Sequence, residues 1–157
     1  MRAFAAVPGG VERTFRSWER ALLEDLCGDL TVLLGAAEQA PSDPALLRLL
    51  PNAYPSDREA AQEFASFARP RLTKSKVESA EAILEDLEQP EPVRLGPDRI
   101  PLWLRGLTDL RLVLAERTGT DPDPAVLDIY DWLGWVLSDL LEALDESPSL
   151  AVRDEQE

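Results

Sequence analysis

The sequence contains no histidine and a single cysteine, Cys27, among its 157 residues. The lack of histidine excludes Ser-His-Asp triads, Cys-His dyads and every acid–base step that uses an imidazole. One cysteine without histidine cannot build a structural zinc site or hold an iron–sulfur cluster. It also cannot form an intramolecular disulfide, which favours a reducing, cytoplasmic environment. We therefore expect no metal and no other cofactor.

Basic residues are also scarce, because 16 Lys and Arg stand against 30 Asp and Glu, which gives a formal net charge of −14. Such a charge repels phosphates, so we expect no direct contact with nucleic acid and none with an anionic membrane. No apolar run approaches the roughly 18 residues that a membrane span needs, and the N-terminus lacks the apolar segment of a signal peptide. The composition favours a cytoplasmic protein whose partner has a basic surface.

Turn and helix-capping signals predict a mainly α fold in a single domain over residues 1–145, followed by a flexible acidic tail over 146–157. A Pro-Gly-Gly turn at 8–10 predicts a β-hairpin within residues 1–16, to which 93–95 can add a third strand. Asp43-Pro44 and Asp123-Pro124 are typical of a helix N-cap followed by a first-turn proline. Pro70 is expected to separate two helices. Residues 17–145 then hold five or six helices around two central C-terminal ones, over 18–37, 45–50, 57–68, 71–87, 97–117 and 124–144.

The predicted helix over 97–117 is apolar on nearly all sides, as is typical of an interior helix. Arg111 lies within its apolar stripe, and a buried guanidinium needs a carboxylate partner. Asp109 points to another side, so Asp131 of the following helix is the expected partner. Two interpretations stay open. Arg111 forms a core ion pair that fixes helix register, or it anchors a small anion or metabolite in a binding or enzymatic site with Asp109 or Asp131 as the base.

The predicted helix over 124–144 carries a regular apolar stripe, to which Tyr130 belongs. Trp132 and Trp135 lie outside this stripe and share a face with each other. Gly134 lowers helix stability by about 1 kcal/mol, which predicts a close backbone approach at that position. Either the tryptophans pack under the hairpin, or they form, together with Tyr130, an exposed patch for a partner or a second copy, because Trp is enriched at interface hot spots.

Cys27 lies at the margin of the apolar stripe of the first long helix. Free cysteine is among the most often buried residue types, so an inert buried thiol is expected. A redox-responsive thiol needs exposure and a lowered pKa, and the acidic neighbours Glu24 and Asp25 disfavour a thiolate.

Four stretches carry a resemblance to a known family: Arg-Leu-Leu-Pro-Asn-Ala-Tyr at 48–54, the region of Lys76, Trp-Leu-Arg-Gly-Leu-Thr-Asp-Leu-Arg-Leu-Val-Leu at 103–114, and Ile-Tyr-Asp-Trp-Leu-Gly-Trp at 129–135. They resemble an actinobacterial family catalogued as a domain of unknown function, DUF2017, and also called AosR-type. The residues that match its motifs are Arg48, Pro51, Tyr54, Trp103, Asp109, Arg111, Tyr130 and Trp132.

The resemblance implies a regulatory or adaptor protein without known enzymatic activity. Such proteins are associated with oxidative-stress transcription, through contact with the transcription machinery and a redox-active cysteine pair. Because Cys27 is the sole cysteine, an intramolecular disulfide switch is impossible in this chain.

We therefore expect a non-enzymatic regulatory protein that acts by protein–protein contact and is linked to transcription or to the oxidative-stress response. Two alternatives remain. One is a metabolite-binding protein or enzyme built around Arg111, and the other is a homodimer that uses the face of Trp132 and Trp135.

Overall fold

The computed structural model describes residues 3–37, 43–50, 56–118 and 123–146. Its elements, in chain order, are β1 (Phe4–Val7), β2 (Gly10–Arg13), α1 (Ser17–Gly35), α2 (Pro44–Leu49), α3 (Arg58–Asp86), β3 (Val93–Leu95), α4 (Ile100–Thr118) and α5 (Pro124–Asp145). The predicted mainly α fold with a small sheet is thereby confirmed. Two motif residues, Pro51 and Tyr54, lie outside the described residues, as does the predicted tail from residue 147 onward.

The sheet is antiparallel, in the order β1-β2-β3. Gly9 has a φ of 85° in the turn that joins β1 to β2, a conformation that glycine adopts at little cost. Gly10 lies so close to β3 that an added Cβ would collide with the carbonyl oxygen of Leu95. The third strand follows α3 in the chain, so the sheet combines the N-terminal hairpin with a segment from the middle of the sequence.

Helix α3 runs without interruption through Pro70, so the predicted division into two helices is wrong. An interior proline removes one backbone hydrogen bond and costs about 3 kcal/mol. The C-terminal part of α3 packs against α1 and α4, and its buried residues are Ser79, Ala80, Ala82, Ile83 and Asp86. The proline lies nine residues before Ser79, the first of these buried residues, so α3 continues through it outside the core.

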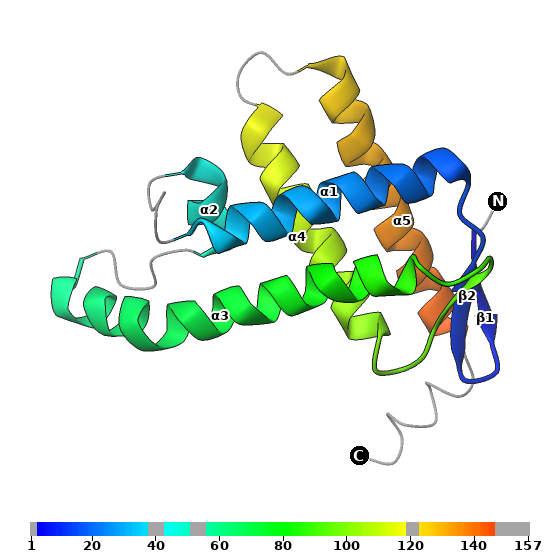
Figure 1. Cartoon of the computed structure of the whole chain (residues 1–157), viewed down its shortest axis with the longest axis horizontal. Coiled ribbons are helices and arrows are strands. Elements are labelled where there is room, and N and C mark those ends of the chain that lie inside the picture. Colours follow the sequence, from blue (N-terminus) through cyan, green and yellow to red (C-terminus); the bar gives the residue numbers. More distant parts are fainter. Residues whose placement is uncertain (1–2, 38–42, 51–55, 119–122, 147–157) are drawn as a thin grey trace.

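Helix α4 is the centre of the helical layer, because it contacts α1, α2, α3 and α5. Figure 1 shows α1 and α3 running side by side along the long axis, while α4 and α5 cross behind α1. Helix α5 packs on α4 and on strands β1 and β2. Its most buried residues, Leu133, Val136, Leu140 and Ala143, are shifted around the helix from the predicted stripe, whose member Tyr130 is half-buried.

Candidate protein-binding surface

Three tryptophans lie where the start of α1 meets α5, and we refer to Trp18, Trp132 and Trp135 as the tryptophan face. The rings of Trp18 and Trp132 are 5.6 Å apart and inclined by 49°. Trp135 lies one turn beyond Trp132 on α5. Trp18 is 54% exposed and Trp135 is 60% exposed. Of the two predicted tryptophans, Trp135 is therefore exposed and does not pack under the hairpin, whereas Trp132 is half-buried and packs against the core.

Trp132 is held by a carboxylate at the start of α1. Its Nε1 donates to Oε2 of Glu19 at 3.3 Å. The other oxygen of Glu19 accepts the backbone N–H of Arg16 at 2.9 Å, which satisfies a donor that the first helical turn leaves unpaired. Glu19 is only 6% exposed. One side chain thus starts the helix and fixes one ring of the tryptophan face.

The same carboxylate joins a buried charge network that connects the sheet to α1 and α5. Arg13 of β2 donates to Oε2 of Glu19 at 2.6 Å, and its Nη1 lies 3.8 Å from Oδ2 of Asp139 in α5. Asp139 also accepts the backbone N–H of Phe4 at 2.6 Å. The guanidinium of Arg13 stacks over Phe4 and Phe15, 5.4 and 4.8 Å from the ring centroids. Removing one member would leave a buried charge uncompensated, so the network ties the sheet to α1 and α5 beneath the tryptophan face.

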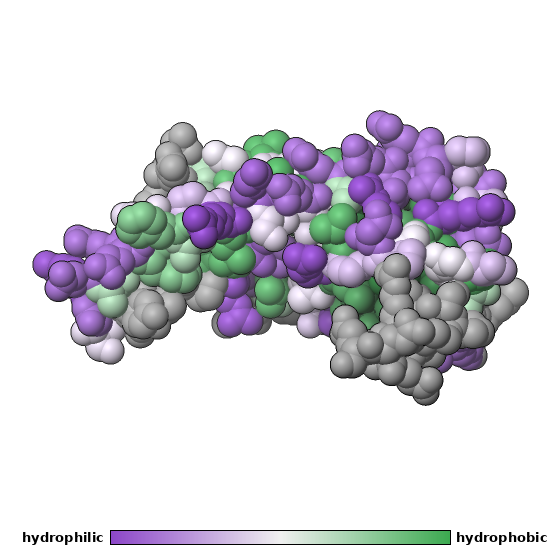
Figure 2. Space-filling view, turned by 90° about the horizontal axis from the view of Figure 1, so that it is seen from below, coloured by the Kyte–Doolittle hydropathy of each residue, from purple (hydrophilic) through white to green (hydrophobic). Residues whose placement is uncertain are grey.

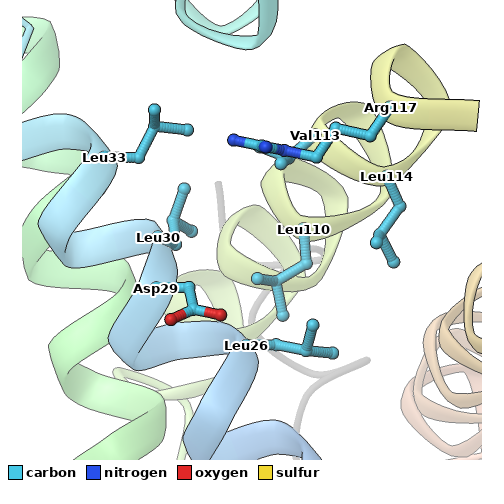
Figure 3. A pocket seen from close by; sticks show the side chains of 8 residues that line it. All are labelled: Leu26, Asp29, Leu30, Leu33, Leu110, Val113, Leu114 and Arg117. Atoms are coloured by element: carbon cyan, nitrogen blue, oxygen red, sulfur yellow. The ribbon is translucent and has the colours of Figure 1, made fainter. Parts of the chain in front are cut away.

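A hollow of about 250 Å³ opens between α1 and α4. Trp18, Leu22 and Leu26 follow one another at intervals of four residues along one side of α1, so this side leads from the tryptophan face to the hollow. Figure 3 shows that the α1 leucines of the hollow face the apolar side chains of α4, and that the guanidinium of Arg117 reaches across its opening. The lining residues are Leu26, Asp29, Leu30, Leu33, Leu110, Val113, Leu114 and Arg117.

Exposed carboxylates lie beside the two tryptophans of α5. Asp128 and Asp131 each stand four residues before a tryptophan of α5, and both are exposed, so they lie beside those rings. Asp25 and Asp29 of α1 are exposed as well. This acidic rim favours the approach of a positively charged partner.

Arg111 is partnered by an aromatic ring, and the predicted ion pair with Asp131 is wrong. Its guanidinium carbon lies 4.2 Å from the centroid of Tyr130, and within the described ranges no carboxylate lies within 4.0 Å of it. A Cβ at Gly134 would be 3.0 Å from its Nη2. The missing side chain of Gly134 makes room for the guanidinium, so the close approach at this glycine comes from Arg111 and not from a backbone. A cation–π contact on a half-buried side chain replaces the expected carboxylate.

Asp109 does form a buried ion pair, but with Lys76 of α3. The Nζ of Lys76 lies 2.8 Å from Oδ1 of Asp109, which is 3% exposed. Burial raises the pKa of Asp109, and the hydrogen bond and charge of Lys76 oppose that rise. Oδ2 of Asp109 has no hydrogen-bond partner.

The motif residue Trp103 belongs to the core. It is fully buried, stacks on Phe15 at a centroid distance of 5.9 Å, and donates its Nε1 to Oδ2 of Asp86 at 2.8 Å. Arg48, in contrast, is exposed on α2, with its Nε 3.8 Å from Oε2 of Glu116. Trp103 is therefore architectural, and Arg48 contributes only a weak surface pair.

Cys27 is fully buried in the face of α1 that packs on the core. Burial raises the pKa of its thiol to about 12. The thiolate, which is the reactive form, is therefore suppressed in the folded protein.

The described part of the chain contains no group of three or more Asp, Glu or Cys side chains arranged to hold a metal ion. Among its helices, none combines the length and the apolar character that a bilayer crossing requires.

Two features of functional interest are absent from the predictions made from the sequence, and only the first has a local signal. Trp18 continues the four-residue spacing of Leu22 and Leu26, and that spacing is a signal for an aromatic residue on the same side of α1. The pairing of Lys76 with Asp109 joins residues 33 positions apart, and no local pattern indicates it.

A protein-family model described as "Domain of unknown function (DUF2017)" matches residues 1–144 of the chain. Searches of curated proteins and of solved structures found no match.

Proposed function

The chain belongs to the DUF2017 family, and we propose that it is a non-enzymatic regulatory or adaptor protein that acts by protein–protein contact. The observation that carries this proposal is the tryptophan face. Two of its three rings are more than half exposed, at 54% for Trp18 and 60% for Trp135. Tryptophan is enriched at interface hot spots.

The charge around this face selects the partner. Exposed Asp128 and Asp131 lie beside the rings of α5, and the whole chain carries a net charge of −14. A basic protein surface would gain both attraction and a faster encounter rate. A second copy would bring two acidic rims together, so like-charge repulsion disfavours a homodimer through this face.

The resemblance to AosR-type proteins favours a partner in the transcription machinery and a cytoplasmic location. It also suggests a link to oxidative stress. In this chain such a link cannot use an intramolecular disulfide, because Cys27 is the sole cysteine. Its raised pKa and burial further disfavour a disulfide with another molecule. Regulation of this protein would then act on its partner or on its abundance, and not on its thiol.

Affinity capture from native cytosol, with and without oxidant, tests the proposal. The bait is the full chain, and it is compared with a Trp18→Ser/Trp135→Ser variant. Both side chains are largely exposed, so the variant is expected to keep its fold. Leu141→Ser is the matched control, because Leu141 is 47% exposed on α5 but lies outside the tryptophan face.

The expected result is a basic protein retained by the wild type and by the control but lost from the double variant, to the same extent in both redox conditions. Light scattering should show a monomer. Equal retention by all three baits would contradict the role of the tryptophan face. A wild-type dimer that the double variant abolishes would replace the basic partner with a second copy.

A further inference from the structure

Helix α3 continues well beyond the part that packs in the core. No described side chain from Arg58 to Glu78 is buried, and Phe67 is 74% exposed. This half of α3 lies at the left end of the molecule in Figure 1. Seen from below in Figure 2, the same end of the surface carries green apolar patches between purple polar residues.

Two hollows meet along this helix. One, of about 470 Å³, lies between α3 and α4 and is lined by Leu72, Ser75, Lys76, Ser79, Leu104, Arg105, Thr108, Asp109 and Leu112. The other, of about 480 Å³, is lined by Phe64, Phe67, Ala68, Arg71 and Leu72. Leu72 belongs to both, so they form one continuous groove, which we refer to as the α3 groove. From Phe67 to Ser79 it follows α3 for about 18 Å at 1.5 Å per residue.

The charge of the α3 groove is opposite to that of the protein. Three of the residues that line it are cations, Arg71, Lys76 and Arg105, and one is a carboxylate, Asp109, which is buried and paired with Lys76. The lining therefore carries a net charge of 3 − 1 = +2, whereas the whole chain carries −14.

Two groove cations are available to a ligand. In the part of the chain that the structure describes, no carboxylate lies within 4.0 Å of Arg71 or Arg105, and both side chains are exposed. Nε of Arg105 donates to the carbonyl of Pro101 in its own helix, at 3.4 Å. An acidic ligand can therefore recruit both guanidinium groups without breaking an existing ion pair, which limits the desolvation penalty.

We propose that the α3 groove binds an acidic amphipathic helical segment of a partner protein. Its apolar face would pack on Leu72, Leu104 and Leu112, and its carboxylates would pair with Arg71 and Arg105. A helix in an apolar groove is a recurring mode of peptide recognition, and a little more than three turns, at about 5.4 Å per turn, fill the length of this groove. The groove is separate from the tryptophan face and selects the opposite charge, so one molecule can join a basic and an acidic partner.

The test is fluorescence anisotropy of labelled synthetic helices with the full-length protein. One peptide of about 14 residues places leucine at helical spacing between glutamates. A matched peptide keeps every leucine and replaces every glutamate with lysine. Despite the net charge of −14, the glutamate peptide should bind at least about tenfold more tightly, which corresponds to 1.4 kcal/mol.

Charge reversal identifies the site. An Arg71→Glu/Arg105→Glu variant should bind the glutamate peptide at least about tenfold more weakly. An Arg58→Glu/Arg117→Glu variant changes the net charge equally outside the groove and should bind it much as the wild type does. Circular dichroism establishes that both variants fold. Trp18→Ser/Trp135→Ser should bind the peptide normally, so failure here is separable from failure at the tryptophan face.

Three results would overturn the proposal. The first is equal or tighter binding of the lysine peptide, and the second is unchanged binding by Arg71→Glu/Arg105→Glu. The third is a different occupant: association with phosphatidylglycerol vesicles but not with the peptide would indicate an anionic membrane, and a dimer that Arg71→Glu/Arg105→Glu dissociates would indicate a second copy.

Discussion

Lys76 and Asp109 join α3 to α4 through a contact of 2.8 Å between Nζ and Oδ1. Both lie in segments that resemble the DUF2017 family, although 33 positions separate them in the sequence. Each charge compensates the desolvation of the other, so the pair connects the two helices in a largely buried position.

The ionisation of Asp109 should leave a signature in the pH dependence of stability. Burial raises its pKa above the ordinary value of 3.8, so the folded state holds the proton more tightly than the unfolded state. The stabilisation from the protonated carboxyl is complete below 3.8 and is lost as the pH rises through the folded pKa. Asp109→Asn has no proton to lose at this site. The free energy of unfolding of the wild type minus that of Asp109→Asn should therefore decrease as the pH rises from 3.8.

Urea denaturation at a series of pH values measures this difference. Because the other carboxylates are common to both proteins, their titration cancels to first order. A difference that grows with pH would show that Lys76 outweighs the desolvation of Asp109, and would contradict a raised pKa for this carboxyl.

Gly106 lies where α4 contacts Ile83 of α3. A Cβ at this position would lie 2.6 Å from Cδ1 of Ile83, a buried core side chain. Gly106→Ala should therefore lower the free energy of unfolding by about 1–3 kcal/mol, because overpacking outweighs the better helix propensity of alanine. Gly28→Ala is the control, since a Cβ there meets nothing within 4 Å, and it should raise stability by up to about 1 kcal/mol. Equal stability of Gly106→Ala and the wild type in urea would refute the close packing of α3 on α4.

Asp86 accepts the hydrogen bond of the buried Trp103 indole. Besides the indole N–H, it accepts from Nε of Arg99 at 3.1 Å. Asp86→Ala leaves the buried indole donor unpaired and should cost about 1–3 kcal/mol in chemical denaturation. Glu85→Ala also removes a partner of Arg99, but Glu85 is 70% exposed, so its loss should cost less than about 1 kcal/mol. An equal loss of stability in both variants would show that the hydrogen bond to Trp103 contributes no more than the exposed ion pair of Glu85.

Cys27 should behave as a protected thiol. With a pKa of about 12 and a fully buried side chain, it should react with a disulfide reagent far more slowly in the native protein than after unfolding in guanidinium chloride. The rate at which the reagent releases its coloured thiolate, measured with and without denaturant, reports this protection. Fast labelling of the native protein would reopen a redox role for this residue.

Much of the fold could be predicted because its signals are local. The N-caps at Asp43 and Asp123 accept the backbone N–H groups of Ala45 and Ala125, each at 2.9 Å, as the Asp-Pro pattern indicates. The hairpin around Gly9 follows from the same kind of short-range rule. The predicted helix end at Pro70 is wrong, because an interior proline removes one backbone hydrogen bond and can bend a helix without ending it.

The candidate site was less predictable, because helical periodicity gives the direction of a side chain and not its partner. Arg111 lies on the predicted side of α4 and meets Tyr130 of the expected helix. Yet an aromatic ring satisfies it where a carboxylate was expected, and the small Gly134 makes this contact possible. The tryptophans of α5 were visible in the sequence, whereas the approach of Trp18 depends on how α1 crosses α5.

Binding of a basic protein to the tryptophan face is measured by isothermal titration calorimetry of the captured partner against the wild type and Trp135→Ala, at low and at physiological salt. Trp135 is 60% exposed, so its loss should leave stability nearly unchanged. The expected result is at least about tenfold weaker binding by the variant, as for an interface hot spot, together with wild-type binding that weakens as salt rises. Equal affinity of the two proteins, independent of salt, would contradict binding through the tryptophan face.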